Sequence, residues 1–435
     1  MTTQICLFED MYYTRLLPLV YFRPTFNLRC GILSLKEKVQ RYYPNAEVTL
    51  HCRSYLADYM RLRNPGLSVN RMTDAEHSSK KNVLFINGRA IVDDECAKKI
   101  PLRGEENVVY VNNDHVVAVR VSGTTLKQLI QRTLREHALN GTYSISDFDG
   151  LKVQQTDVTL IHYPWDLIKH NGNQLRSDFA VLKHNQRNRK PKFKKYPGVY
   201  LLNEKNIFIG EGTVVQPGVV IDAEEGPVFI GNHVTILPFS YIAGPAYIGD
   251  HSVVKVGAKI YHNTSIGPVC KVGGEIEASI IHSYSNKQHD GFLGHSYLGA
   301  WVNCGAGTVT SDLKNNYSPV KVYVQGEPVN SGEQFVGVTI GDHSKTAINS
   351  TFNTGTVIGV SSNIFGTGFP PKYVPSFSWG AAGETFTTYN ADKAIDVARK
   401  VMKRRNVTLS EYEETLFRKI FDLTSEERRK RGMPL

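Results

Sequence analysis

Much of the second half of the chain repeats every six residues, and this period constrains the fold more than any other feature. Small or β-branched residues follow most of the repeated aliphatic positions four places later. A strand repeats every two residues and a helix every 3.6, and neither period would produce this pattern, whereas a hexapeptide β-helix does. The sequence therefore predicts a three-sided prism with a core column of aliphatic side chains. The repeated positions are Ile209, Val215, Ile221, Ile230, Ile236, Ile242, Ile248, Val254, Ile260, Ile266 and Val272, then Leu298 and Cys304, and then Ile340, Thr346, Phe352, Ile358 and Ile364.

The period is interrupted twice, at 275–293 and at 311–335. Long loops on a regular scaffold are where binding and catalysis are usually placed. We therefore predict that the prism continues through two insertions, and that these insertions carry functional residues.

The first 150 residues alternate short apolar runs with amphipathic segments, which predicts a mostly parallel sheet wrapped by helices. The expected strands are 4–9, 48–51, 83–87, 108–111 and 116–121, and the expected helices are 32–42, 54–61 and 124–138. Two more helices, 391–405 and 411–430, are expected after the repeats, covering the open end of the prism or a neighbouring subunit.

These patterns divide the chain into a first domain at 1–180, a linker at 181–200, the prism at 201–380 and C-terminal helices at 381–435. The linker is basic, and two interpretations stay open: a solvated connection, or a rim that attracts phosphate. Few aromatic residues lie among its charges, so a nucleic-acid partner is not expected. The charges are Lys183, Arg187, Arg189, Lys190, Lys192, Lys194 and Lys195.

Composition places the chain among soluble globular proteins with more than one core. Hydrophobic residues make up 41%, and Lys and Arg exceed Asp and Glu by 51 to 41. No apolar run approaches the roughly 20 residues of a membrane span, and no secretory signal is evident. A cytoplasmic protein without a membrane partner is expected. Six scattered cysteines indicate neither disulfides nor a zinc site, and Cys270 and Cys304 are expected to be buried thiols.

The loop after the first strand, 11–31, is the natural position for a nucleotide in such a sheet. It leads through Gly31 into a helix, and Arg23, Arg29 and Lys38 lie nearby. A helix N-terminus with basic neighbours can hold a phosphate. The alternative is that these are surface charges around an ordinary loop, because no Walker or GxGxxG sequence is present.

Three segments resemble one family of known enzymes: YPWDLI at 163–168, GHSYLG at 294–299 and VNCGAGT at 302–308. They are similar to segments of the bifunctional sugar-1-phosphate nucleotidyltransferases and glucosamine-1-phosphate N-acetyltransferases. RPTFNLRCGILSLKEK, at 23–38, is similar to a branch of sugar nucleotidyltransferases. The resemblance covers nearly the whole chain. It implies an α/β Rossmann-like nucleotidyltransferase domain, a left-handed parallel β-helix of hexapeptide repeats and a short C-terminal helical segment.

The resemblance also implies substrates and site residues. Acetyl-CoA, Mg²⁺, a nucleoside triphosphate and a sugar-1-phosphate are expected, with UDP-N-acetylglucosamine as a typical product and a homotrimer as the assembly. His295, in the family's H-x-x-Y-x-G region, is expected to be the general base, because an amine attacking a thioester must lose a proton. One residue fewer separates it from its tyrosine than in the family, so His282 and His289 stay candidates. The other expected positions are Tyr297 and Asn303 for catalysis, Gly305, Ala306, Gly307 and Asn349 for the cofactor, and Asp312 and Lys314 for the sugar phosphate.

Two departures from the family leave alternatives open. Glu277 stands where the family places a phosphate-binding lysine, and a carboxylate there would repel a sugar phosphate unless Lys287 takes over. Arg89 stands near the family's magnesium-binding aspartate, and arginine cannot bind magnesium. Asp10, Asp93 and Asp94 remain metal candidates. An acyltransferase alone, or a regulatory protein that binds a nucleotide sugar, are the alternatives.

Overall fold

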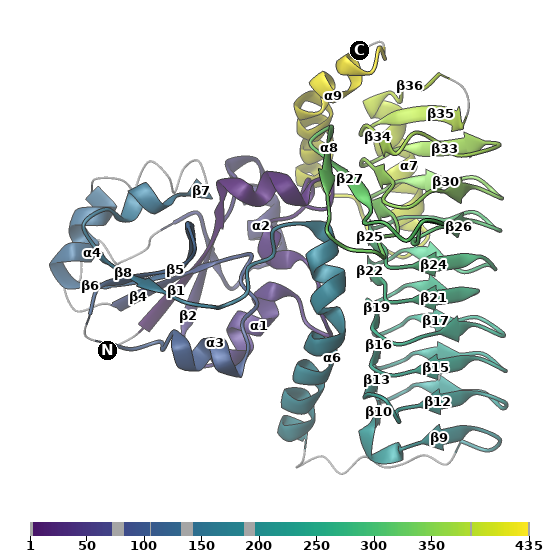
Figure 1. Ribbon diagram of the computed structural model, residues 1–435, viewed down its shortest axis with the longest axis horizontal. Coiled ribbons are helices and arrows are strands. Elements are labelled where there is room, and N and C mark those ends of the chain that lie inside the picture. The colour runs from purple at the N-terminus through teal and green to yellow at the C-terminus, as the bar shows by residue number, and fades with distance from the viewer. Residues whose placement is uncertain are drawn as a thin grey trace.

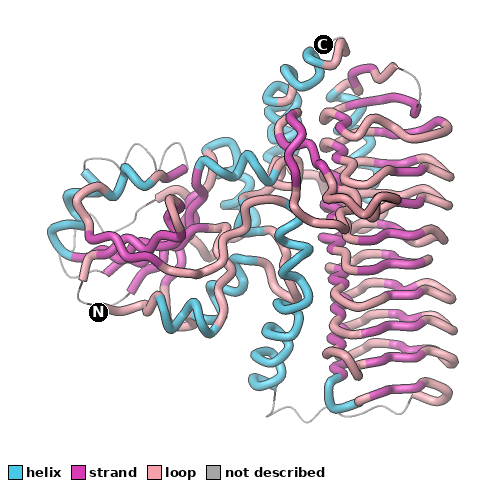
Figure 2. Tube along the Cα trace, viewed as in Figure 1, coloured by secondary structure: helices cyan, strands magenta, loops and turns pink. Residues whose placement is uncertain are grey.

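The computed structural model describes residues 3–71, 82–104, 106–131, 142–186, 196–382 and 385–433. A sheet flanked by helices makes up the first part, and a tall stack of short strands lies beside it (Figure 1). Magenta strands and pink turns alternate up the stack at regular intervals (Figure 2). No helix in the described ranges is long and apolar enough to cross a bilayer.

The sheet of the first part is mostly parallel, as predicted. In spatial order its strands are β3 (Ser68–Val69), β2 (Glu47–His51), β1 (Thr3–Asp10), β4 (Asn82–Asn87), β6 (His115–Ser122), β5 (Val108–Asn112) and β8 (Lys152–Gln155), with β7 (Thr142–Tyr143) against the end of β1. Only β6 runs against its neighbours β4 and β5. The carboxyl ends of β1 and β4 therefore lie at one edge, where ligands of such sheets bind.

Helices cover this sheet at the three positions where they were expected, and also at four positions where none was expected. They are the 3₁₀-helices η1 (Met11–Leu16), η2 (Thr25–Asn27), η3 (Ser54–Leu56) and η6 (Ile145–Phe148), and the α-helices α1 (Leu35–Tyr42), α2 (Ala57–Arg63), α3 (Asp94–Lys99) and α4 (Gly123–Leu129). The four that were not expected are η1, η2, α3 and η6. Helix α1 begins three residues later than predicted because Ser34 and Glu37 form a capping box. Part of the predicted helix 124–138 lies outside the described residues.

The second part is a left-handed parallel β-helix with three flat faces. Face A contains β10 (Ile207–Ile209), β13 (Val228–Ile230), β16 (Ala246–Ile248), β19 (Thr264–Ile266), β22 (Ile280–Ser283), β25 (Tyr297–Ala300), β29 (Thr339–Ile340), β32 (Val357–Ile358) and β34 (Tyr373–Val374). Face B contains β11 (Val214–Val215), β14 (Thr235–Ile236), β17 (Val253–Val254), β20 (Lys271–Val272) and β23 (Asn286–Lys287), then β30 (Lys345–Thr346), β33 (Asn363–Gly366), β35 (Ser378–Ala382) and the antiparallel β36 (Thr387–Thr388). Face C contains β9 (Tyr200–Leu202), β12 (Val220–Asp222), β15 (Tyr241–Ala243), β18 (Lys259–Ile260), β21 (Glu275–Glu277) and β24 (Phe292–Gly294), and β26 (Val309–Thr310) and β31 (Thr351–Phe352) extend it.

The predicted aliphatic column is confirmed by the strand register. On face A, Ile248 pairs with Ile266 and Leu298 pairs with Ile340. These side chains are at most 1% exposed, so each coil buries its aliphatic residue against the coils above and below. The two prism cysteines, Cys270 and Cys304, are free and buried, as expected.

The first predicted insertion, 275–293, is wrong. Its residues form one more coil of the prism, containing β21, β22, β23 and β24. Ile266 pairs with Ile281, 15 residues on, whereas Ile248 and Ile266 are 18 apart. Shortened corners therefore removed the sixfold period without removing the coil. The second insertion, 311–335, does leave the prism and contains the hairpin of β27 (Lys321–Val324) and β28 (Glu327–Asn330).

Helix α6 (Pro164–Gln186) joins the two parts and runs along face A of the prism (Figure 1). The predicted linker 181–200 begins as the last turns of this helix, and 187–195 lie outside the described residues. Asn171 of α6 accepts a hydrogen bond from the backbone N–H of Gly31 at 2.7 Å, and Ser265 of face A donates to the Gly31 carbonyl at 2.9 Å. The first domain is thus held against the prism through the loop that precedes α1.

The C-terminal helices α7 (Ala391–Lys403), α8 (Glu411–Leu423) and α9 (Ser425–Lys430) lie mainly at the junction rather than over the open end of the prism. Buried side chains of α7 and α8 share one core with the first domain and with Trp301 and Phe377 of the prism. Phe386, before α7, and Met433, after α9, pack into the prism core. The apolar faces of these helices therefore stabilise the contact between the two parts.

Candidate acyl-transfer and nucleotide sites

A pocket of about 340 Å³ opens at the corner where face B turns into face C. Successive coils supply its wall, which consists of Lys255, Val256, Gly274, Gln288, His289, Asp290, Ala306 and Gly307. Two of the predicted cofactor-binding residues, Ala306 and Gly307, therefore line one pocket together with an exposed histidine.

The other two predicted cofactor residues lie directly beside this wall. The backbone N–H of Asn349 donates to the Ala306 carbonyl at 2.7 Å. Gly307 has φ +69°, and a Cβ there would lie 2.2 Å from Oδ1 of Asn349. A Cβ on Gly305 would meet the Ala347 backbone at 2.4 Å, so both glycines are required by the close stacking of coils. The structure thus brings together Gly305, Ala306, Gly307 and Asn349.

His289 is the histidine of this pocket. Its side chain is exposed at the corner, and the backbone N–H groups of Ala306 and Gly307, one coil further, have no acceptor among the described residues. The spacing of the family's H-x-x-Y-x-G region is met by His289, Phe292 and Gly294, with phenylalanine in place of tyrosine. That spacing is the signal that favours His289 over the first choice.

His295, the first choice, lies one face away, at the corner between faces C and A. Its Nδ1 is 2.8 Å from Oδ2 of Asp312, and the two side chains are 24% and 12% exposed. The Phe335 ring stacks on the imidazole with centroids 5.0 Å apart. The structure therefore joins two predicted residues, His295 and Asp312, into a histidine–carboxylate pair, but it does not place them on the wall that Ala306 and Gly307 form.

Tyr297 does not reach either histidine. It is 1% exposed on face A, and its hydroxyl accepts a hydrogen bond from the backbone N–H of Arg29 at 3.0 Å. The expected catalytic role is corrected, because this side chain is enclosed between the prism and the first domain. Asn303 lies on face B, where its Oδ1 accepts from Nδ2 of Asn286 at 3.0 Å, one coil away.

The expected sugar-phosphate residues are dispersed. Lys314 lies in the insertion, and its Nζ donates to the Pro319 carbonyl at 2.6 Å. Glu277 lies 3.6 Å from Nε2 of His262, which can offset its charge when the imidazole is protonated. Lys287, the suggested substitute cation, is 1% exposed and donates to the His289 carbonyl at 2.6 Å. Lys287 therefore holds the corner that carries His289 rather than facing a ligand.

The predicted phosphate cradle of the first domain is occupied by protein groups. Arg23 forms a buried ion pair with Asp342 of the prism, and Lys38 forms one with Asp178 of α6. The Arg29 guanidinium donates to the Ile32 carbonyl. The prediction that Arg23 and Lys38 bind substrate is corrected, because their donors stabilise the loop and its contact with the prism and α6. The buried Nε of Arg29 has no hydrogen-bond partner among the described residues, so the role of Arg29 stays a prediction.

Two of the three metal candidates of the first domain, Asp10 and Asp93, have protein partners too. Asp10, at the end of β1, pairs with the Arg89 guanidinium and accepts from Nδ2 of Asn87 at 2.9 Å. Asp93 caps α3 by accepting from the Cys96 N–H at 2.9 Å. Within the described ranges no three His, Cys, Asp or Glu side chains are placed to hold a metal. The carboxylates of Asp10 and Asp93 are therefore engaged by protein groups rather than open to magnesium.

Arg15, at the carboxyl edge of the sheet, differs from the arginines that form buried ion pairs. The Arg15 guanidinium carbon lies 4.6 Å from the Tyr12 ring centroid and 5.6 Å from that of Tyr163, and it has no ion-pair partner among the described carboxylates. His115 and His162 lie beside it, with ring centroids 4.8 Å apart. Burial, followed by the Arg89 charge, lowers the pKa of His162 to about 4, so this imidazole is neutral at pH 7.

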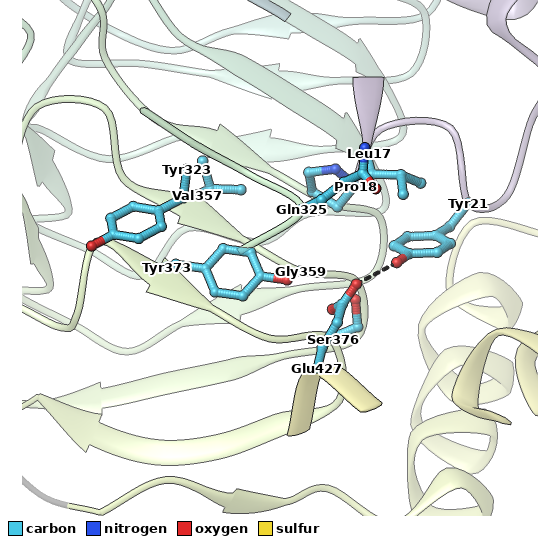
Figure 3. A pocket seen from close by; sticks show the side chains of 10 residues that line it. All are labelled: Leu17, Pro18, Tyr21, Tyr323, Gln325, Val357, Gly359, Tyr373, Ser376 and Glu427. Carbon is cyan, nitrogen blue, oxygen red and sulfur yellow. Dashed lines mark hydrogen bonds between the residues drawn. The ribbon is translucent and has the colours of Figure 1, made fainter. Parts of the chain in front are cut away.

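A second cavity lies at the junction of the loop after η1, the hairpin, the prism and α9 (Figure 3). Its volume is about 10 Å³, which is the space of one water molecule. The Tyr21 hydroxyl donates to Oε1 of Glu427 at 2.6 Å across it. This cavity belongs to the contact between domains and is too small for a substrate.

Comparison with known proteins gives matches for both parts. Residues 5–187 match the family model described as sugar nucleotidyl transferase, and residues 227–262 match the bacterial transferase hexapeptide model with six repeats. The chain thus combines a sugar nucleotidyl transferase domain with hexapeptide repeats.

Two curated proteins are similar to it. The bifunctional sugar-1-phosphate nucleotidylyltransferase/acetyltransferase of Sulfurisphaera tokodaii is 36% identical over 97 residues, which is 22% of this chain and 24% of that protein. The bifunctional protein GlmU of Bartonella quintana is 26% identical over 318 residues, 68% of this chain and 62% of that protein. The matched regions span less than two thirds of either relative. One solved structure, a crystal structure of UDP-N-acetylglucosamine acyltransferase, is also similar. The match spans 55% of this chain and 89% of the acyltransferase chain, with 16% sequence identity and a TM-score of 0.29.

Proposed function

We propose that this chain, a sugar nucleotidyl transferase domain joined to hexapeptide repeats, is a two-site transferase. In the prism it acetylates the amine of an amino-sugar phosphate, and in the first domain it attaches a nucleotide to a sugar-1-phosphate. The names of its relatives support this pairing of activities. The observation that carries the acyl half is the pocket in which His289 shares a wall with Ala306 and Gly307.

The pocket offers the groups that acyl transfer needs. The acceptor nitrogen forms a bond to the thioester carbon of acetyl-CoA while the carbon–sulfur bond breaks, and His289 takes the proton that the nitrogen loses. The unpaired N–H groups of Ala306 and Gly307 are donors for the carbonyl oxygen as it gains negative charge. A proton then returns to the leaving thiolate, so that coenzyme A departs as a thiol.

In the first domain Arg15 is the group best placed for a nucleotide phosphate. It lies at the carboxyl edge of the sheet, and its guanidinium donors are not consumed by a described carboxylate. Arg23, Arg53, Arg89 and Lys38 are all buried in ion pairs and cannot serve in this way. Because the described carboxylates do not form a magnesium site, we assign no step to a metal.

The proposed substrates are acetyl-CoA, glucosamine-1-phosphate and UTP, and the proposed product is UDP-N-acetylglucosamine. These substrates are cytoplasmic, and we propose that location for the protein. A homotrimer is supported by exposed apolar side chains that recur at the corner of the pocket, where Phe239, Val256 and Ile348 are 74%, 61% and 69% exposed. We propose the same order of domains, with α6 as the connection and with the prism extended past residue 380 by β35 and β36.

The test follows two products separately. The protein is incubated with acetyl-CoA, glucosamine-1-phosphate, UTP and magnesium, and free thiol and pyrophosphate are measured. Both products are expected from the wild-type protein. Thiol without pyrophosphate would restrict the function to the prism, and the absence of both products with a range of sugar phosphates would contradict the proposal.

A further inference from the structure

Two imidazoles lie together at the edge of the first domain's sheet where β1 and β4 end. His115 begins β6, and because β6 is antiparallel to β4, its first residues lie at the carboxyl end of β4. His162 lies in the segment before α6, and its backbone N–H donates to Oδ2 of Asp166 at 2.8 Å. The centroids of the two rings are 4.8 Å apart. Two separate segments thus bring these residues, the histidine pair, to the edge where ligands of such sheets bind.

Aromatic rings connect the histidine pair with Arg15 of η1. The guanidinium carbon of Arg15 lies 4.6 Å from the centroid of the Tyr12 ring, and the His115 ring meets the same ring edge-on at 4.4 Å. The Tyr163 ring, which follows His162 in the sequence, is 5.6 Å from the guanidinium. Each histidine therefore has a neighbour on which Arg15 also packs, and the charge of Arg15 acts on both imidazoles.

The charges around the histidine pair leave an excess of positive charge. Nη1 of Arg89 lies 3.5 Å from Nδ1 of His162, but the buried ion pair of Arg89 with Asp10 is neutral as a whole. Arg15 adds a cation, and the exposed Asp114 adds an anion that water and salt screen. Burial and then the Arg89 charge lower the pKa of both histidines, so each imidazole is neutral at pH 7. An anionic ligand would therefore meet neutral imidazoles beside a cation that no described carboxylate pairs.

One nitrogen of the histidine pair is buried without a partner in the described part of the chain. It is Nδ1 of His115, which neither donates nor accepts a hydrogen bond there. Leaving a buried polar atom unpaired is unfavourable, and folded proteins usually avoid it. Packing against Tyr12 explains a ring at this position, but it does not explain an imidazole, because an apolar ring would pack without that cost. The unpaired nitrogen therefore indicates a ligand.

We propose that Arg15, His115 and His162 form one phosphate-binding site, in which the histidine pair binds phosphate oxygens of the nucleotide beside the arginine. A neutral imidazole donates one N–H to a phosphate oxygen, and a protonated imidazole adds a complementary charge. The phosphates oppose the Arg15 and Arg89 charges that disfavour protonation, so the histidines take up protons when the nucleotide binds. This inference rests on the proposed nucleotide site, and it adds two residues and a proton uptake to that site.

The experiment measures the binding of UTP, inorganic tripolyphosphate and uridine to the full chain by calorimetry at pH 6 and pH 8. The variants are His115→Gln and His162→Gln, because a glutamine cannot be protonated in this range. His233→Gln is the matched control, since the His233 ring also has an imidazole neighbour, His251, at 5.0 Å but is exposed on the prism.

Each substitution in the histidine pair is expected to weaken UTP and tripolyphosphate binding about tenfold at pH 6 and less at pH 8, because the protonated imidazole binds the phosphate more strongly. Uridine binding and the control variant are expected to be unchanged. Titrations in two buffers of different ionisation enthalpy count the protons that binding takes up, and the wild type should take up more than either variant. The ionisation of UTP itself is common to all the proteins, so the difference between them reports the histidines.

Four outcomes would overturn the inference. They are unchanged UTP affinity in both variants, an equal loss for uridine, an equal loss in His233→Gln, and a loss that is the same at pH 6 and pH 8 without a change in proton uptake. The last of these would show a purely structural role. Melting temperatures within about 4 °C of wild type show that a variant folds. Should His162→Gln fail this criterion, the affinity and proton uptake of His115→Gln decide the question.

Pyrophosphate release separates this inference from the proposed nucleotidyl transfer. UTP binding that depends on the histidine pair, in a protein that releases no pyrophosphate, would support the phosphate site and contradict the transfer reaction. Pyrophosphate release at the wild-type rate in both variants, with unchanged UTP affinity, would support the reaction and contradict the phosphate site.

Discussion

Basic residues have opposite surroundings in the two halves of the molecule. In the first domain, Arg23 and Lys38 are buried against carboxylates and hold the loop before α1 against the prism and α6. In the prism, Lys255 and Lys271 stand without a described carboxylate beside an open pocket. A buried, paired cation contributes to architecture, whereas an unpaired cation at a pocket is available to a ligand. The comparison directs the search for phosphate binding to Arg15 in one half and to the pocket corner that carries Lys255 in the other.

The first way to break this comparison is to remove a paired cation. Arg23→Ala leaves the Asp342 carboxylate buried without its guanidinium, and we expect a loss of about 3–5 kcal/mol in the free energy of unfolding. Arg61→Ala is the matched control, because its pair with Asp58 is exposed and such pairs contribute about 0–1 kcal/mol. Urea unfolding at pH 7 measures both. Equal effects would show that the buried pair is not structural.

The next test concerns the open pocket. His289→Ala is expected to lower the rate of thiol release by about 10²-fold or more, because no other described pocket residue is a histidine that can accept the amine's proton. His295→Ala, which removes the partner of Asp312, is expected to affect the rate less. Steady-state rates with acetyl-CoA and glucosamine-1-phosphate check both variants. A larger loss of rate in His295→Ala than in His289→Ala would identify His295 as the general base.

A third test compares two arginines of the first domain. Arg15→Ala is expected to weaken UTP binding by roughly 1–3 kcal/mol, the range for a lost hydrogen bond to a charged group. Arg29→Ala, whose guanidinium donates to the Ile32 carbonyl, is expected to leave the affinity unchanged. Calorimetric titration with UTP measures both. A loss of UTP affinity in Arg29→Ala alone would support the phosphate-binding site that was predicted from the sequence.

The smallest effect is expected from a lysine of face B. Burial lowers the pKa of Lys345 to about 8, and an unfolded lysine titrates near 10.4. The unfolded chain therefore binds more protons between these values, and stability rises with pH by about 1 kcal/mol per unit from pH 8 to 10. Lys345→Met should remove this dependence. Unfolding free energies measured across that interval would show no difference between the proteins if Lys345 were exposed.

The repeat was predictable from the sequence because each coil must bury an aliphatic residue at the same place. Ile248, Ile266 and Leu298 could be placed on one column by counting. The coil around Ile281 was missed because shortened corners change the spacing without changing which residues face inward. Periodicity reveals a regular repeat, and it does not distinguish a shortened coil from an insertion.

The candidate site was predictable in part. The close stacking at Gly305 and Gly307 follows from residue type, and the pocket contains the expected Ala306. The partners of Arg23 and Tyr297 could not be predicted from the sequence, because they depend on how the first domain packs against face A. That docking joins residues more than 250 positions apart, and no local pattern encodes it.

A structure of the protein with acetyl-CoA bound tests the central claim most directly. The account predicts that the thioester carbonyl lies against the N–H groups of Ala306 and Gly307, with His289 beside the acetyl carbon. Acetyl-CoA bound beside His295 and Asp312, or anywhere that leaves the corner pocket empty, would contradict it.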